Sequence, residues 1–275
     1  MLKTYTPQAA ELQKYIAMFY VFTNDKPRKF SYYVFPHTYT NISFIKSASV
    51  GRDNYEITIE STKATLTNFA VEITGKYTRP LIVNYAGDFD EISVIFKPLG
   101  VNHFFSQPLT NIANQYSQKL NSKPWVNACK ALFTYNTVEE KLAFIEQFLM
   151  ANFLPKDYNL LEKSISLLEN IEQDYTIEAV ASIVGVSTKT LARKFQQELC
   201  CTPSEYKRIS RFRHAVNTKL LTSELKSLTD ISYQSNFYDQ SYFIKEFKKL
   251  TRLNPKKFFD TITTFEENKI IWEVR

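Results

Sequence analysis

The sequence predicts a two-domain α+β protein, in which a β-rich N-terminal domain with trailing helices precedes an all-α C-terminal domain. The chain has 275 residues, and roughly 100–200 residues make one domain. Residues 1–105 have strand-like sequence and helical sequence follows, including a helical block that is repeated at an offset of 51 residues. We therefore expect domains at 1–155 and 156–262 and a C-terminal tail at 263–275.

The predicted strands lie in the N-terminal domain. Segments 31–35, 55–59 and 91–96 are rich in β-branched and aromatic residues and are separated by polar, Gly or Pro positions. Several alternate apolar and polar residues, which predicts an antiparallel sheet or a small, cupin-like barrel with one buried face. Aromatic residues on strands usually belong to the core, but those that could instead line a ligand pocket are Tyr32, Tyr33, Phe35, Phe44, Tyr55 and Phe96.

Trailing helices are predicted before the domain boundary. Residues 109–120 have the pattern of a short helix. Thr137 and Glu140 have the spacing of a capping box, which predicts that a second helix begins there and ends near the proline at 155. One stripe of that helix carries Leu142, Ile145, Leu149 and Asn152. Such a broad stripe packs on its own domain or forms a dimer seam.

The C-terminal region contains an internal repeat, in which 177–186 aligns with 228–237. Gly185 meets Asn236, and both residue types tolerate the left-handed backbone that a tight turn between helices requires. After the turn the offset becomes 52, with the pairs Ser187/Asp239, Leu191/Phe243, Phe195/Phe247, Pro203/Pro255 and Tyr206/Phe258. Each repeat is a short helix, a turn, a second helix and a Pro-initiated helix, which are the proportions of a helix-turn-helix unit.

The second helix of each unit has an apolar face and a polar face. Leu191, Phe195 and Leu199 recur every four residues and should face the core, as should Phe243 and Phe247 in the second unit. The outward faces carry Lys189, Ala192, Arg193 and Gln196 in the first unit and Gln240, Ser241, Lys245 and Lys248 in the second. Both are polar, basic ridges of a kind that enters a major groove.

A long helix should join the two units. Thr202 is a good N-cap, Pro203 suits the first helical position and Glu205 completes a capping box. A helix from there to about Leu221 is a rod of about 28 Å, close to the ~34 Å that separates two recognition helices on one DNA face. Its basic side chains suit phosphates or intramolecular pairs, and they are Lys207, Arg208, Arg211, Arg213 and Lys219.

Positive charge is concentrated in this region. Residues 187–258 contain fifteen Lys or Arg and six Asp or Glu, a net charge of +9, whereas the whole chain carries +6. A basic block inside a folded helical segment indicates nucleic-acid binding, although a solvated basic face would also produce it.

Segments 191–195, 202–215 and 237–249 resemble the DNA-binding domain of AraC/XylS-type transcription regulators. The resemblance runs through 160–260 and implies seven helices, with two helix-turn-helix units joined by a long helix. It implies base contacts by Lys189, Ala192, Arg193, Gln240, Ser241 and Lys245, with Arg193 suited to guanine and Gln240 to adenine. Phosphate contacts are expected from Thr190, Gln196, Lys207, Arg211 and Lys248.

Two positions depart from the family pattern. Ala192 replaces a polar reader, so contact with a thymine methyl is all that it can offer. Asn236 replaces the turn glycine, which should soften the second unit slightly.

The N-terminal domain also resembles a known class, through residues 5–7, 19–20, 34–36 and 94–100. These segments are similar to the β-rich domain that some regulators of this family carry for ligand sensing or dimerisation. The resemblance implies double-stranded DNA as the partner. It leaves open a small-molecule effector of unknown identity, RNA polymerase and a second copy of the chain.

The sequence predicts no catalytic residue, metal or cofactor. His37, His103 and His214 lack metal-site spacing, and the five glycines form no phosphate-binding motif. The acidic cluster Asp88, Asp90 and Glu91 is interpreted as a polar turn before a strand at Ile92 rather than as an acid–base pair. The odd number of cysteines, at 129, 200 and 201, argues for reduced thiols.

Residues 1–20 lack the pattern of a signal peptide, and the longest strongly apolar run, 15–24, is far shorter than the ~20 residues that span a bilayer. We therefore expect a cytoplasmic protein without a membrane partner. Two alternatives to a regulator remain open. One is an architectural DNA-binding protein without sequence preference. The other is a DNA-repair enzyme, which would need a reactive cysteine in a Pro-Cys-His context that this chain lacks.

Overall fold

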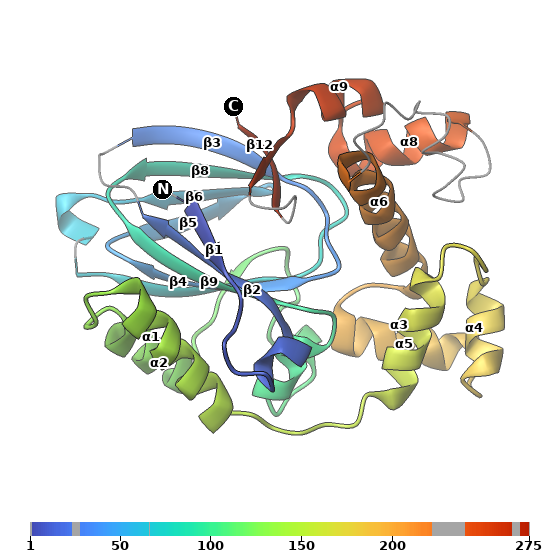
Figure 1. Ribbon diagram of the computed structural model, residues 1–275, viewed down its shortest axis with the longest axis horizontal. Helices are drawn as coiled ribbons and strands as arrows, with labels where there is room; N and C mark the ends of the chain where they lie inside the picture. The colour runs from blue at the N-terminus through green and yellow to red at the C-terminus, as the bar shows by residue number, and fades with distance from the viewer. Residues whose placement is uncertain (1, 24–27, 66, 222–239, 266–269, 275) are drawn as a thin grey trace.

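The computed structural model describes residues 2–23, 28–65, 67–221, 240–265 and 270–274. Figure 1 shows a strand-rich body with α1 and α2 against one side of it, and a separate helical half that begins with α3. A β-rich N-terminal domain followed by a helical C-terminal domain confirms the predicted fold class.

The described strands form two six-stranded sheets, in the orders β1-β2-β9-β4-β7-β10 and β11-β12-β3-β8-β6-β5. Neighbouring strands are antiparallel except for β6 and β8, which run parallel. The strands are β1 (Leu2–Tyr5), β2 (Ile16–Thr23), β3 (Arg28–Val34), β4 (Thr40–Lys46), β5 (Ser49–Asp53), β6 (Glu56–Glu60), β7 (Phe69–Thr74), β8 (Leu81–Gly87), β9 (Asp90–Phe96), β10 (Gln118–Lys119), β11 (Thr263–Phe265) and β12 (Ile270–Val274).

The first sheet is covered on both faces. Ile42 and Phe44 of β4 belong to the core that includes residues of α1 (Lys123–Leu132) and α2 (Val138–Ala151), whereas Ile45 belongs to the core between the sheets. Trp125 of α1 stacks on Phe44 with ring centroids 5.9 Å apart. Because both faces are buried, the central strands of this sheet are apolar on both sides.

Helix α2 begins where the sequence predicts. The Glu140 backbone N–H donates to the Thr137 hydroxyl at 3.2 Å, and the Thr137 N–H donates to the Glu140 carboxylate at 3.0 Å. Ile145 and Leu149 are buried in the core beneath the first sheet. The apolar stripe therefore packs on its own domain.

The helix predicted at 109–120 is wrong. This segment contains a single 3-10 turn, Leu109–Asn111, and then the short edge strand β10. The Gln118 side-chain amide donates to the Ile112 carbonyl, and Gln118 pairs with Ile73 of β7. Asparagine and glutamine side chains in this segment can bond to backbone groups that a helix would need for its own hydrogen bonds. The pairing of β10 with β7 then determines the conformation of the segment.

The described part of the helical domain has two cores, one for each unit. Leu191, Phe195 and Leu199 are at most 1% exposed in the first core, and Phe243 and Phe247 are equally buried in the second, which confirms the predicted inward faces. The helices are α3 (Asn159–Glu169), α4 (Ile177–Ile183), α5 (Thr188–Leu199), α6 (Pro203–Leu221), α8 (Gln240–Thr251) and α9 (Pro255–Thr261). Helix α6 contributes to both cores, because Tyr206 lies in the first and Phe212 in the second.

The N-terminal domain contributes a residue to the second of these cores. Phe35, which follows β3, is fully buried and lies 4.8 Å from Phe258 of α9, ring centroid to ring centroid. The C-terminal strand β12 also lies beside this contact, because it pairs antiparallel with β3 and Trp272 is opposite Val34 in the register. The predicted tail is thus in part a strand of the N-terminal domain's sheet (Figure 1).

The first unit touches the N-terminal domain at a different point. The Asn102 side chain donates to the backbone carbonyl of Glu198 at 2.8 Å and to its carboxylate at 2.9 Å. The Tyr158 hydroxyl donates to the same carboxylate at 3.0 Å. Each unit is therefore anchored to the β-rich body by its own contact.

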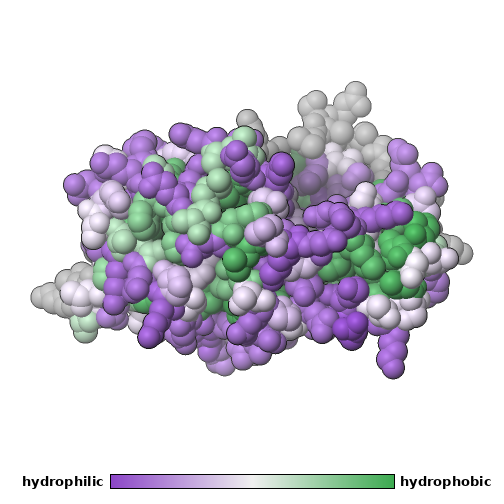
Figure 2. Space-filling view, turned by 90° about the horizontal axis from the view of Figure 1, so that it is seen from below, coloured by the Kyte–Doolittle hydropathy of each residue, from purple (hydrophilic) through white to green (hydrophobic). Residues whose placement is uncertain are grey.

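Most of the surface seen in Figure 2 is polar. Apolar side chains gather at the helical end of the molecule, the end that carries α4 in Figure 1, where Ile183 is 43% exposed. Among the described residues, no helix combines the length and the apolar character that crossing a membrane requires.

Replacing Phe35 with alanine should loosen the second unit. Truncating a buried phenylalanine costs about 3–5 kcal/mol, and here the cavity would open between Phe35 and Phe258. Hydrogen exchange should show lost protection in α8 and α9 with α5 unchanged. Phe195→Ala, which opens a cavity in the first core, is the matched control and should expose α5 instead. Unchanged protection of α8 in Phe35→Ala would show that this ring does not hold the second unit.

Candidate nucleic-acid interface and barrel cavity

The turn of the first unit has the geometry that the sequence predicts. Thr176 caps α4 by accepting from the Ala179 N–H at 3.1 Å, and Ser187 caps α5 by accepting from the Thr190 N–H at 3.1 Å. Between these helices Gly185 has φ +72°, in the left-handed region that glycine tolerates best. This turn fixes the angle at which α5 leaves α4.

Helix α5 presents the predicted polar face. Lys189, Arg193 and Gln196 are exposed, while Ala192 and Thr190 are half-buried. The Arg193 guanidinium donates to the Gln197 side-chain oxygen at 3.2 Å, one helical turn later. This exposed bond is easily exchanged, so the guanidinium is available to a DNA base.

Helix α8 occupies the corresponding position in the second unit. Ser241, Lys245 and Lys248 are exposed on it, opposite the buried Phe243 and Phe247. Gln240 is the first residue of α8, but its side chain lies outside the described part of the chain, as do Asn236 and the predicted first helix of this unit.

The linking helix α6 starts and ends at the predicted residues, Pro203 and Leu221. The Glu205 N–H donates to the Thr202 hydroxyl at 3.2 Å, and the Thr202 N–H donates to the Glu205 carboxylate at 2.9 Å, which completes the predicted capping box.

Most of the basic side chains on α6 are engaged within the protein. Lys207 lies 2.7 Å from the Asp174 carboxylate, and Arg211 pairs with the same carboxylate. Arg208 lies 3.6 Å from Glu246 of α8. Burial lowers the pKa of Lys207 and of Arg211. These contacts correspond to intramolecular pairing, the alternative that the sequence left open for this helix.

Arg213 does not lie on the surface of α6, where a phosphate could reach it. It is 8% exposed, and it donates from Nε to the Pro36 carbonyl at 2.7 Å and from Nη2 to the Phe35 carbonyl at 2.6 Å. Burial lowers the pKa of Arg213 to about 10, so the side chain is still charged at neutral pH. A charged donor on two buried carbonyls ties α6 to the loop after β3.

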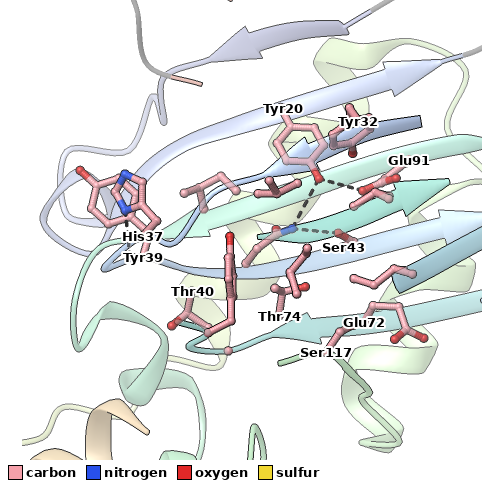
Figure 3. Close-up of a pocket in the computed structure, with 18 of the residues that line it drawn as sticks. Tyr20, Tyr32, His37, Tyr39, Thr40, Ser43, Glu72, Thr74, Glu91 and Ser117 are labelled. Atoms are coloured by element: carbon pink, nitrogen blue, oxygen red, sulfur yellow. Dashed lines mark hydrogen bonds between the residues drawn. The ribbon is translucent and has the colours of Figure 1, made fainter. Parts of the chain in front are cut away.

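A cavity of about 150 Å³ lies between the two sheets (Figure 3). Its wall is largely aromatic and aliphatic, and it includes Phe35 and Arg213, the two residues that join the domains. Of the aromatic residues considered from the sequence, Tyr32 and Phe35 line it, whereas Phe44 and Phe96 belong to the core under α1 and α2. Tyr33 packs against the second helical core, and Tyr55 stacks on Tyr116.

Glu91 also lines this cavity, which corrects its interpretation as part of a polar turn. The strand β9 begins at Asp90, and Glu91 is 1% exposed. Its carboxylate accepts from the hydroxyls of Tyr20 at 2.9 Å, Tyr85 at 2.7 Å and Ser93 at 3.0 Å. Burial and the Glu91 charge raise the pKa of Tyr20 and of Tyr85 well above the usual value, so both hydroxyls stay protonated and donate. The period-two pattern of β9 sets Glu91 and Ser93 on the face opposite Ile92 and Val94, so no local signal in the sequence could have placed this carboxylate in the interior.

The opposite end of the cavity carries His37 and Tyr39 (Figure 3). Burial, together with the charges of Arg213 and Lys76, holds the pKa of His37 well below its usual value, so this ring is neutral. Within the part of the chain that the structure describes, no three His, Cys, Asp or Glu side chains cluster in a way that could hold a metal ion.

Comparison with known proteins finds a family match for each half. A family described as "Helix-turn-helix domain" matches residues 180–261, and a "Domain of unknown function (DUF6597)" matches residues 3–118. An HTH-type transcriptional regulator from the cgkA 5′ region of Pseudoalteromonas carrageenovora is 30% identical over 142 residues, which are 51% of this chain and 80% of that protein. The lactose operon transcription activator of Staphylococcus xylosus is 32% identical over 89 residues, 32% of this chain and 31% of its own length.

Solved structures that the comparison matches include ToxT from Vibrio cholerae, at 14% identity and a TM-score of 0.45, with 88% of this chain and 97% of that chain covered. An AraC-type DNA-binding domain from Chromobacterium violaceum is 30% identical, with a TM-score of 0.33, and covers 36% of this chain.

The helix-turn-helix match over residues 180–261, together with the exposed polar faces of α5 and α8 on either side of the long helix α6, defines a DNA-binding transcription regulator. The linking helix and the regulator relatives specify the family further. The chain belongs to the AraC/XylS-type helix-turn-helix transcription regulators.

Arg213→Ala should destabilise the contact between the domains. It leaves the Pro36 carbonyl without its Arg213 donor, which costs about 1–3 kcal/mol, and it removes one of the two donors of the Phe35 carbonyl, which keeps the Tyr77 hydroxyl. Urea denaturation should show this loss. Arg211→Ala is the control, because it removes only a partly exposed ion pair with Asp174 and should cost at most about 1 kcal/mol. Equal losses in the two variants would contradict a structural role for the Arg213 bonds.

Proposed function

We propose that this regulator reads DNA with α5 and α8 and that a small molecule in the N-terminal cavity controls that reading. One observation carries the proposal: Phe35 lines the cavity and at the same time belongs to the core of the second unit. A ligand that presses on Phe35 therefore acts on the packing of α8 and α9 without an intervening element.

Arg213 supports the same route. It lines the cavity, stands on the helix that joins the two units, and binds the Phe35 carbonyl. An effector shifts the protein toward one arrangement only if it binds that arrangement more tightly than the other. Phe35 lines the cavity, and its carbonyl binds Arg213 of α6. A change in the position of Phe35 would therefore alter the shape of the cavity together with the position of α6, so a ligand would bind the two arrangements with different affinity.

Base reading is assigned to the exposed faces of the two recognition helices. In the first unit the proposed readers are Lys189, Ala192 and Arg193, with Arg193 on a guanine and Ala192 on a thymine methyl. In the second unit they are Gln240, Ser241 and Lys245.

Phosphate contacts are assigned to Thr190, Gln196 and Lys248, which flank these readers. Lys207 and Arg211 were also expected to contact phosphates. We instead assign both side chains to ion pairs with Asp174, because a move of either side chain to a DNA phosphate would break its ion pair. Phosphate neutralisation supplies affinity and the base contacts supply selectivity.

Domains at 1–155 and 156–262 remain our proposed division, with residues 263–275 as an extension that reaches back to β3. RNA polymerase and a second copy of the chain remain candidate partners. A dimer seam on the buried stripe of α2 is disfavoured, because Ile145 and Leu149 are used within the domain. The relatives act on transcription, which favours a cytoplasmic location.

The repair-enzyme alternative requires a reactive thiol. Burial raises the pKa of Cys129 and of Cys201 to about 12 and that of Cys200 to about 11. A buried thiol with a raised pKa is a poor nucleophile at neutral pH. The relatives are transcription regulators, which also favours a protein without catalytic activity.

Selection from a random duplex library with the full chain, near physiological salt, tests the proposed reading. We expect two half-motifs about ten base pairs apart. Arg193→Ala should then weaken binding to the selected site by about 1–3 kcal/mol and relax one base position. Lys248→Ala is the control and should weaken binding to all duplexes alike, with a salt slope lower by about one. Enrichment of no motif, with salt-sensitive binding, would favour the architectural alternative.

Labelling with iodoacetamide at pH 7.5 tests the enzyme alternative. Fewer than about one thiol in a thousand is ionised when the pKa is 11 or higher. The native protein should therefore react far more slowly than free cysteine, and all three thiols should react once the protein is unfolded. Rapid native labelling of Cys200, identified by its loss in Cys200→Ser, would revive the enzyme alternative.

A further inference from the structure

The cavity between the sheets has a polar end at which three hydroxyl groups donate hydrogen bonds to one carboxylate. Tyr20, Tyr85 and Ser93 each donate a hydroxyl proton to Glu91. The Ser93 hydroxyl has a single proton, which it donates to Glu91. In the 2.6 Å contact between the two serine hydroxyls, Ser43 is therefore the donor and Ser93 the acceptor. The protons at this end are therefore directed toward the carboxylate.

Asn41 continues the same direction. Its amide nitrogen donates to Ser43 at 3.1 Å and to the Tyr20 hydroxyl at 3.4 Å (Figure 3). This leaves the Asn41 side-chain oxygen, which is buried and has no hydrogen-bond partner among the described residues. Asn41 and Glu91 both line the cavity, so this end offers acceptors to a ligand.

Glu91 also differs from the other carboxylate in the cavity wall. Glu72 forms an ion pair with Arg52, whereas Glu91 forms none with a basic side chain of the described chain. A buried carboxylate held only by hydroxyl groups is stabilised further by a cation. The rings of Tyr20, Tyr32 and Tyr85 surround this end, and aromatic faces attract cations as well.

The basic groups of the cavity wall lie toward the other end. Arg213 binds the carbonyls of Phe35 and Pro36, next to His37, and Figure 3 shows His37 and Glu91 at opposite ends. A cavity of about 150 Å³ holds one six-membered ring, as a cavity of about that size in another protein holds benzene. The ring of a ligand whose head lies at Glu91 would extend toward Phe35.

We propose that the effector is a small organic cation, with an ammonium or amidinium head bound by Glu91 and Asn41 and one apolar ring directed at Phe35. This inference rests on the proposed control of DNA binding through the cavity and adds the class of ligand to it. The ring that reaches Phe35 is the part of the ligand that the second unit would sense.

Three probes with one ring and different heads test this class: 2-phenylethylamine, 2-phenylethanol and phenylacetate. Calorimetry with the full chain at neutral pH should show that the amine, which is protonated there, binds more tightly than the alcohol and the acid. Glu91→Gln should weaken binding of the amine about 30-fold or more, because it removes one partner of a buried charge pair. Glu72→Gln is the matched control and should leave binding nearly unchanged, since that carboxylate is already paired with Arg52.

The ranking of the probes on the unchanged chain decides the class even if Glu91→Gln fails to fold. Asn41→Leu, which leaves Glu91 in place, should also weaken binding of the amine. Val83→Phe fills the cavity and should abolish binding of every probe, which locates the site. Tighter binding of phenylacetate or 2-phenylethanol, no binding of any probe, or full affinity in Glu91→Gln would overturn the cation proposal.

Affinity for the selected duplex separates this inference from the proposed function. If the acid binds in the cavity and shifts DNA affinity, the ligand class is wrong and control through the cavity stands. If the amine binds through Glu91 and DNA affinity does not change, the ligand class stands and control through the cavity fails.

Discussion

The burial of Phe35 between two domains is the contact on which the rest of the arrangement depends. Its ring completes the core that holds α8 and α9 to α6, and its carbonyl accepts from Arg213 and, at 3.1 Å, from the Tyr77 hydroxyl. A buried polar group must be hydrogen-bonded. Moving the Phe35 ring without the Phe35 carbonyl, or the carbonyl without the ring, would therefore cost free energy. A residue that lines the cavity is thereby also a structural part of the DNA-binding half.

This arrangement would give the proposed effector a geometric route to DNA. The first unit is fixed to the β-rich body through Asn102 and Glu198, while the second is fixed through Phe35 and Arg213. Under the proposed control, a shift of Phe35 relative to Asn102 would change the distance or angle between α5 and α8. Two recognition helices on one DNA face must be about one helical turn apart, so a small change in their relation is enough to favour or oppose binding.

Local features of the sequence predicted the helical half in detail. The cap residues Thr202 and Ser187, the turn at Gly185 and the four-residue spacing of Leu191 and Phe195 are all where the sequence placed them, because their physical causes lie within a few residues. The contacts that join the halves could not be predicted in this way. Arg213 binds a carbonyl 178 positions earlier in the chain, and Glu91 meets Tyr20 across 71 positions, so no local pattern records either contact.

The same distinction applies to charge. The basic excess of residues 187–258 identified the correct half of the chain, yet four of its cations, Lys207, Arg208, Arg211 and Arg213, are partnered within the protein. Pairing with Asp174 holds α6 against the segment before α4, and so it sets the position of the first unit. These pairs hold α6 in place, and in the proposed complex the phosphates would be left to the exposed residues of α5 and α8. A count of basic residues therefore overstates the number of phosphates that the protein neutralises and the salt dependence that would follow from it.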